Sequence, residues 1–430
     1  MATVRLRNPK ALASQLGPGL VTGAADDDPS GIATYSQAGA QFGYGLLWTL
    51  VLTYPLMCAI QLISANIGRV TGMGLAKNMD AVLPRSVVTG LVSLLFVANT
   101  INIGADIAAM GATADLVVRH GGFPIVEGAK IFAVAFAVLC LGLQMFVPYH
   151  RYVNFLKWLT MALFAYVAVV FLVHVDWLVV AKSIVIPPLK LTRDAVTTIV
   201  AVFGTTISPY LFFWQAAEEV EDVDKDDAAK PLTEAPRQAR GAFARMRLDT
   251  FVGMGFSNLI ALAIVISTAA TLNAHGVTDI QTASQAAEAL APVAGPFAFV
   301  LFALGIIGTG LLAVPVLAGS SAYAIGEARG WKCGLEHQPW EARGFYGVIA
   351  AGTLLGMAII WSPLDPIKAL FWSAVINGVA AVPIMVAMMI VASRHSQMGH
   401  FTTNLGLKLW GWAATAVMAV AAVAMFVLAF

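Results

Sequence analysis

The sequence predicts an all-α protein that crosses a membrane many times. Of its 430 residues, 59% are hydrophobic and only 11% are charged, whereas charged residues make up about 25% of an ordinary soluble domain. A net charge of +1 provides no basis for binding nucleic acid. The three cysteines, Cys58, Cys140 and Cys333, are too scattered for a disulfide framework or a zinc site. We therefore expect a single domain in a lipid bilayer, with no obligate protein partner.

Eleven apolar segments approach or exceed the length of about 20 residues that crosses a bilayer as a helix. The first five cover 16–42, 45–68, 86–117, 129–147 and 152–175. The other six cover 194–218, 247–272, 293–326, 343–362, 365–392 and 405–429. Most are separated by connections that carry charged or helix-breaking residues, which is where membrane helices end.

Basic residues in alternate connections predict the orientation of these helices. The N-terminus and every second connection together hold 18 Lys and Arg residues, and the opposite set holds 6. Because Lys and Arg concentrate on the cytoplasmic side of a membrane, we expect a cytoplasmic N-terminus in the cell membrane. An odd number of helices then places the C-terminus outside.

The first apolar segment is interrupted by Asp26-Asp27-Asp28-Pro29-Ser30-Gly31. Charge at bilayer depth is costly and marks transport paths, and Pro with Gly opens the helix only where protein or water covers the backbone. A surface loop between two short helices is the alternative interpretation. Apolar helical sequence on both sides, at 16–25 and 32–48, favours a break inside one membrane-spanning helix.

A second break is predicted in the sixth segment, at Gly204-Thr205-Thr206-Ile207-Ser208-Pro209-Tyr210. Pro209 follows Pro29 by 180 residues, so each half of the chain begins with a broken helix. Because each half has an odd number of helices, the second half is inverted relative to the first, as in many transporters with a site at the membrane midplane. We expect a first repeat at about 16–175, an inverted repeat at about 194–392, and an eleventh helix at about 405–429.

The segment from Gly17-Pro18-Gly19 through Asp28-Pro29 to Gln37-Ala38-Gly39-Ala40-Gln41-Phe42-Gly43-Tyr44 resembles the first helix and loop of the Nramp divalent-metal transporters. Weaker similarity continues to the eighth helix. The resemblance implies a leucine-transporter type fold, with two inverted five-helix repeats plus one helix. It also implies movement of a divalent cation by alternating access between the two broken helices.

The departures from the family pattern concern its metal ligands. Nramp proteins carry Asp-Pro-Gly-Asn in the first helix, where Asp and Asn bind metal; here Asp28 is present, but Gly31 takes the place of Asn. In the sixth helix, the family's Ala carbonyl and Met sulfur bind metal, and Thr205 and Ser208 stand at those positions. The resemblance thus assigns metal contacts to Asp28, Gly31, Thr205 and Ser208, without the thioether.

A site of carboxylate, carbonyl and hydroxyl oxygens suits magnesium, calcium or manganese, whereas a thioether favours softer ions. Magnesium keeps several of its waters and binds through one or two carboxylates. We also expect Gly31 and Ser208 to widen the cavity. These features are similar to the Nramp-related magnesium transporter branch, so we expect Mg²⁺ or Mn²⁺ as the transported ion, with no cofactor.

Further ligands are predicted beyond the second break. Gln215, Glu218 and Asp222 share one helical face, where they either bind waters of the ion or line its route to the cytoplasm. The alternative for Glu218 and Asp222 is a solvated helix end. Asp27 is the second candidate among the acids of the first helix, and Asp26 is expected at the entry.

Proton coupling is not expected. The resemblance places Tyr210 at the family's histidine, and of the family's acids in the third helix only Asp106 has a counterpart, if one residue is skipped. Asn99, Asn102 and Asp106 share a face, for which we expect interhelical hydrogen bonds rather than a proton relay. On the tenth helix the family's glutamine corresponds to Ala380, and Asn377 is a weaker candidate one turn earlier.

Two alternatives stay open. One is a proton-coupled Mn²⁺ or Fe²⁺ transporter of the Nramp type, and the other is an ion-coupled carrier of organic solutes with the same fold. An enzyme is not expected, because the seven histidines are isolated and no H-E-x-x-H spacing occurs.

Overall fold

The computed structural model describes residues 22–23, 25–147, 160–187, 192–226, 228–335 and 337–429, and these residues are almost entirely helical. Nine helical stretches in this part of the chain are long and apolar enough to cross a membrane. A tenth is added if the bent pair Met161–Leu172 and Trp177–Val185 forms one span. The predicted segments map onto these stretches, with the first two counted together as Pro29–Thr71. The fifth, 152–175, overlaps the bent pair only from residue 161, and its residues 152–159 lie outside the described part of the chain.

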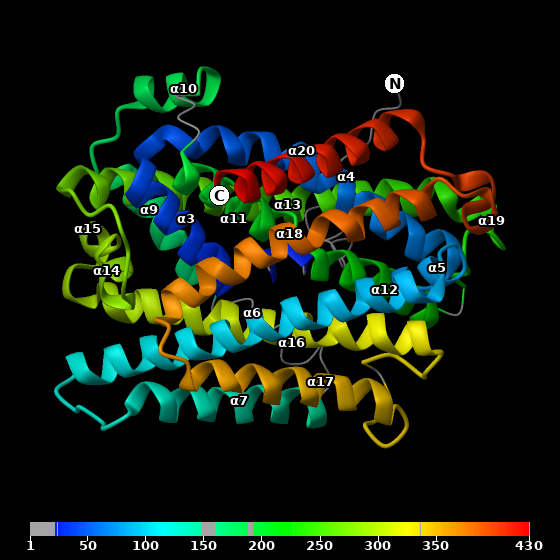
Figure 1. Cartoon of the computed structure of the whole chain (residues 1–430), viewed down its shortest axis with the longest axis horizontal. Helices are drawn as coiled ribbons and strands as arrows, with labels where there is room; N and C mark the ends of the chain where they lie inside the picture. The colour runs from blue at the N-terminus through cyan, green and yellow to red at the C-terminus, as the bar shows by residue number, and fades with distance from the viewer. Residues whose placement is uncertain are drawn as a thin grey trace.

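Most helices run side by side along the long axis of the molecule (Figure 1). The main helices are α3 (Pro29–Phe42), α4 (Leu47–Thr71), α6 (Arg85–His120), α7 (Gly128–Phe146), α9 (Phe164–Leu172), α11 (Arg193–Thr206), α12 (Pro209–Lys225), α13 (Ala239–Thr271), α16 (Ala298–Arg329), α17 (Arg343–Gly356), α18 (Pro366–Ala392) and α20 (Leu405–Ala429).

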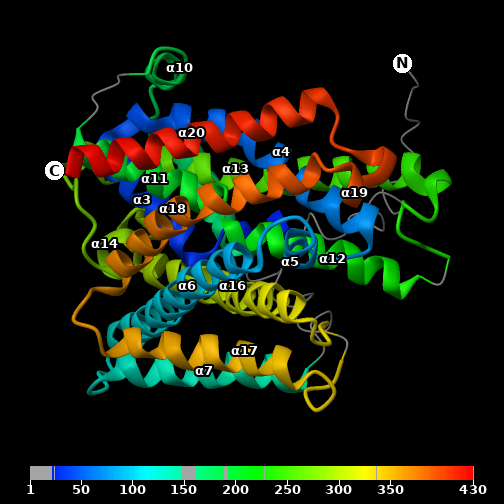
Figure 2. The same cartoon turned by 45° about the vertical axis from the view of Figure 1, so that its right-hand side comes forward.

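Short helices occupy the connections, and the sequence did not predict them. They are α5 (Leu75–Asp80), α10 (Trp177–Val185), α14 (Ala283–Glu288), α15 (Ala291–Ala294) and α19 (His395–Met398). In Figure 1 α14 and α15 lie at the left end of the bundle and α5 and α19 at the right, and Figure 2 again shows α14 and α19 at opposite ends. Helix α10 follows α9 after a bend of 112° and lies on the outside of the bundle, where it contacts α4.

The predicted interruption of the first segment is present. Residue 27 is a bend, Asp28 is extended with φ −69° and ψ 169°, and α3 begins at Pro29. Proline is favoured at the first helical position because its missing N–H would have no partner there. Asp28 is the N-cap residue, and its side chain accepts a hydrogen bond from the Gly31 N–H. The part of this segment before residue 22 lies outside the described residues.

The second predicted interruption has the same construction. Helix α11 ends at Thr206, Ser208 is extended with φ −76° and ψ 132°, and α12 begins at Pro209. A proline at the start of each second half-helix therefore ends the helix before it.

Small residues let the helices around the two breaks approach closely. A Cβ built on Gly204 of α11 would lie 2.4 Å from the Gly378 nitrogen of α18. A Cβ on Gly23, just before the first break, would lie 2.4 Å from the Gly253 carbonyl oxygen of α13. Both distances are shorter than a real Cβ contact, so these positions require glycine, as is typical of close helix packing in membranes. Helix α3 packs against α13, α18 and α11, which encloses the first break.

Candidate functional site

Asp28 lies at the first break with its carboxylate fully enclosed. Its Oδ1 accepts hydrogen bonds from the Ser30 hydroxyl at 2.6 Å and from the Gly31 N–H at 2.8 Å. Its Oδ2 accepts one from the Asn102 amide of α6 at 2.9 Å. The residue is 2% exposed. A carboxylate has about four acceptor positions, so these three donors orient Asp28 and leave it able to bind a cation.

Asn102 lies on α6 and connects the first break to α18. Its Nδ2 also donates to Asp106 Oδ2 at 3.2 Å, one turn further along α6. Its Oδ1 accepts from the Asn377 amide of α18 at 3.3 Å. Asn99, one turn before, donates to Ser320 and Ser321 of α16. The expected interhelical hydrogen bonds are confirmed for Asn99 and Asn102, whereas the bond of Asp106 to Asn102 stays within α6.

Asp26 and Asp27 turn toward α13. The Ser257 hydroxyl contacts both carboxylates, at 2.6 Å from Asp26 Oδ2 and 2.9 Å from Asp27 Oδ1. A hydroxyl has one proton, so Ser257 donates to one carboxylate at a time. The three aspartates thus point toward different helices: Asp28 faces α6, and Asp26 and Asp27 face α13.

At the second break, the Ser208 side chain is bonded to the backbone of its own turn. The Ser208 hydroxyl donates to the carbonyl oxygens of Gly204 at 2.7 Å and Thr205 at 3.0 Å, within its own turn. Its oxygen keeps lone pairs for a cation, but its proton is used by the backbone.

Two side chains approach Gly31 closely, and its predicted widening of the cavity stays a prediction. A Cβ built on Gly31 would lie 3.0 Å from Thr205 Oγ1 and 3.3 Å from the Tyr35 ring. Thr205 and Tyr35 therefore occupy the space that an asparagine side chain would need. This contact also shows that the two breaks face each other.

Helix α12 is tied to the residues before the first break. The Tyr210 hydroxyl donates to the Ala25 carbonyl at 3.0 Å. Gln215 Oε1 accepts from the Thr22 hydroxyl at 2.6 Å. Gln215 is therefore buried against the first helix, as its depth in the span predicted.

The acids at the end of α12 differ in their surroundings. Glu218 is half-buried and ten residues beyond Ser208, which is about 15 Å along a helix. It is too far to share one ion with Ser208, so its place on the ion's route or at a solvated helix end stays a prediction. Glu219, which the sequence did not single out, is fully buried and pairs with Arg245 of α13 at 2.5 Å. Glu221 accepts from Tyr323 of α16 and from the Leu335 N–H.

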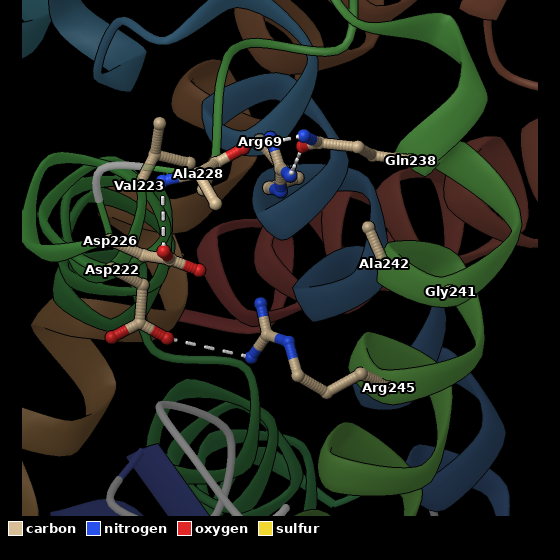
Figure 3. Close-up of a pocket in the computed structure, with 10 residues that line it drawn as sticks. Arg69, Asp222, Val223, Asp226, Ala228, Gln238, Gly241, Ala242 and Arg245 are labelled. Atoms are coloured by element: carbon tan, nitrogen blue, oxygen red, sulfur yellow. Dashed lines mark hydrogen bonds and ion pairs between the residues drawn. The ribbon is translucent and has the colours of Figure 1, made fainter.

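Asp222 lines a cavity of about 400 Å³ between α12 and α13 (Figure 3). Its carboxylate lies 3.6 Å from the Arg245 guanidinium, and Arg69 on the opposite wall donates to the Gln238 side chain at 2.9 Å. Asp222 is thus part of an ion-pair cluster rather than a simple solvated helix end.

No group of three or more His, Cys, Asp or Glu side chains in the described part of the chain is arranged to hold a metal. Asp28 stands instead among amides, hydroxyls and carbonyls. Such a set matches a hard cation that keeps part of its hydration shell.

Comparison with known families decides the relationship. The family Nramp, described as natural resistance-associated macrophage protein-like, matches residues 19–428. The chain belongs to the Nramp family. Two Nramp relatives bear the name divalent metal cation transporter MntH. The one from Acidiphilium cryptum is 27% identical over 400 residues, covering 91% of this chain and 84% of the relative. The one from Klebsiella pneumoniae is 27% identical over 433 residues, covering 97% and 96%.

Solved structures support the fold. A mutant of the Eremococcus coleocola manganese transporter has a TM-score of 0.72 at 18% identity, covering 98% of this chain and 88% of that one. Mhp1, a nucleobase-cation-symport-1 family transporter, has a TM-score of 0.59 at 13% identity, covering 96% and 92%. The predicted leucine-transporter type fold of this Nramp protein is confirmed.

Sequence reasoning missed Ser257, Glu219 and Arg245. Ser257 is one of many hydroxyls in apolar helices, and only the packing of α13 on α3 brings it to Asp26 and Asp27. Arg245 precedes the predicted start of the seventh segment at 247, but α13 begins eight residues earlier, at Ala239. That extension is what places Arg245 opposite Glu219.

Proposed function

We propose that this Nramp protein transports divalent metal cations across the cell membrane, with Mg²⁺ as the main substrate and Mn²⁺ also accepted. The observation that carries the proposal is the position of Asp28. Its residue is 2% exposed, and it lies at the break of one helix and bonds to Gly31, which faces Thr205 of the second broken helix. A buried carboxylate between two open backbone segments is the arrangement that binds and then releases a cation at the membrane midplane.

The donor set favours magnesium over softer ions. The atoms available near the breaks are the Asp28 carboxylate, the Ser208 and Thr205 oxygens and the backbone carbonyls. Thiolate and thioether ligands select softer metals, and oxygen ligands suit Mg²⁺ and Mn²⁺. The ion is bound with several of its waters, and Gln215, Asp27 and Glu218 line its path.

Transport proceeds by alternating access without proton coupling. Tyr210 stands where the family has a histidine, and its hydroxyl is bonded to the Ala25 carbonyl. Uptake is driven by the ion gradient and the membrane potential, which is worth about 2.3 kcal/mol per charge per 100 mV. The N-terminus is cytoplasmic, as the distribution of Lys and Arg predicts.

A proton-coupled Mn²⁺ transporter is the second candidate. The buried carboxylate of Asp106 favours it. The fold alone does not separate either candidate from a carrier of organic solutes, since Mhp1 shares it.

The test is uptake by liposomes that contain the purified protein, with separate indicators for metal and for lumenal pH. We expect Mg²⁺ and Mn²⁺ entry with no change in lumenal pH, loss of entry in Asp28→Ala, and normal entry in the control Asp115→Asn. Asp115 lies on α6 and pairs with Arg119 at 2.6 Å, near the end of the helix. Metal entry accompanied by lumenal acidification would favour the second candidate, and absence of divalent transport would overturn both.

A further inference from the structure

Two carboxylates of the site share the amide of Asn102. One is Asp28 at the first break, and the other is Asp106 on α6. Asn102 Nδ2 lies 2.9 Å from Asp28 Oδ2 and 3.2 Å from Asp106 Oδ2. The side chains of Asp28 and Asp106 are therefore held on two sides of one NH₂ group. Neither pairs with a Lys or Arg among the described residues.

Two oxygens on this face have no partner. Asp106 Oδ1 and Asn377 Oδ1 are buried, in residues that are 0% and 1% exposed, and neither accepts a hydrogen bond. Leaving such a group unpaired is unfavourable, and more so for a charged group. Both unpaired oxygens belong to side chains that are hydrogen-bonded to Asn102, whose amide also donates to Asp28.

The opposite face is only partly engaged, because Thr205 Oγ1 is also buried without a hydrogen-bond partner. Ser208 donates to two carbonyls of its own turn, and Thr205 fills the space beside Gly31. The unpaired oxygens toward α6 and α18 are a carboxylate and an amide oxygen, which only accept hydrogen bonds and are therefore the acceptors that the waters of a hydrated cation need.

We propose that Asp106 is a second carboxylate of the cation site, which binds the transported ion through its retained waters together with the Asn377 oxygen. Asn102 is a positioning residue that fixes both carboxylates. This inference rests on the proposed function, and it assigns to the third helix of the bundle a part of the substrate site. One or two carboxylates with several waters is the usual way proteins hold Mg²⁺.

The experiment is calorimetric titration of the purified full chain with Mg²⁺ and, separately, with hexaamminecobalt(III), whose ligands do not exchange and which therefore binds only through its outer shell. Asp106→Asn keeps the shape of the side chain and the acceptor for Asn102. We expect this substitution to lower the affinity for both Mg²⁺ and hexaamminecobalt(III) at least tenfold. Asn377→Ala should lower both affinities by a smaller factor. Asp115→Asn, which removes a carboxylate from the same helix away from the site, should bind as the wild type does.

The outcomes separate the two proposals. Wild-type affinity for Mg²⁺ and hexaamminecobalt(III) in Asp106→Asn, with binding lost in Asp28→Ala, would overturn this inference and leave the proposed function standing. Equal Mg²⁺ binding by the wild type and Asp28→Ala, or no binding by either, would overturn the proposed function as well. Thermal unfolding of each variant in detergent verifies that it is folded.

Discussion

The Tyr210 hydroxyl donates a hydrogen bond to the Ala25 carbonyl over 3.0 Å, and this bond joins the start of α12 to the last turn before the first break. Broken helices leave carbonyls without helical partners. The buried Tyr210 hydroxyl, from the other broken helix, takes the place of the missing backbone donor to Ala25. The aromatic side chain thus stabilises the pair of breaks.

Tyr210→Phe removes that donor and leaves the Ala25 carbonyl unpaired. We expect a loss of about 1–3 kcal/mol in stability, the cost of an unsatisfied buried acceptor. Thermal unfolding of the purified protein measures it. Metal uptake by the variant should keep the same dependence on external pH as the wild type, and a change in that dependence would show that Tyr210 moves protons.

Gly31→Asn restores the residue that most Nramp proteins carry, but here it should abolish uptake. The new Cβ would lie 3.0 Å from Thr205 Oγ1, and the remaining side-chain atoms need more space still. The double variant Gly31→Asn with Thr205→Ala removes the obstacle and should recover uptake. Full activity of the single variant would show that the two breaks do not face each other this closely.

Ser208→Met introduces a thioether at the second break. Sulfur is a softer ligand than oxygen, so we expect competition by Cd²⁺ and Mn²⁺ against Mg²⁺ uptake to become at least tenfold stronger. Ser208→Ala serves as the matched control, because it removes the hydroxyl without adding sulfur. An unchanged selectivity in a transport-competent Ser208→Met protein would mean that position 208 does not contact the ion.

Arg245→Met breaks the ion pair with Glu219 and leaves a fully buried carboxylate uncompensated. Removing one partner of a buried pair costs about 3–5 kcal/mol, so the unfolding temperature should fall clearly. Asp222→Asn is the comparison, since this carboxylate lies 3.6 Å from Arg245 and its side chain is 39% exposed. Equal effects of the two substitutions would contradict the assignment of Glu219 as the main partner.

The sequence was sufficient for the fold and the two breaks, because long apolar segments and Pro-interrupted helices are local signals. Asp28 and Asn102 were recognisable as polar residues in apolar helices, but their contact depends on how α3 and α6 pack. The filled space beside Gly31 could not be foreseen, since Thr205 is 174 residues away in sequence and only the approach of α11 brings it there. The same holds for Arg245, whose partner depends on where α13 begins.

The central claim is that a divalent cation binds at Asp28 between the two breaks. Anomalous scattering from the purified protein crystallised with Mn²⁺ tests it most directly. We expect one strong peak next to the Asp28 carboxylate and on its Asp106 side, absent from Asp28→Ala crystals grown in the same way. A peak elsewhere in the bundle that persists in Asp28→Ala would contradict the account.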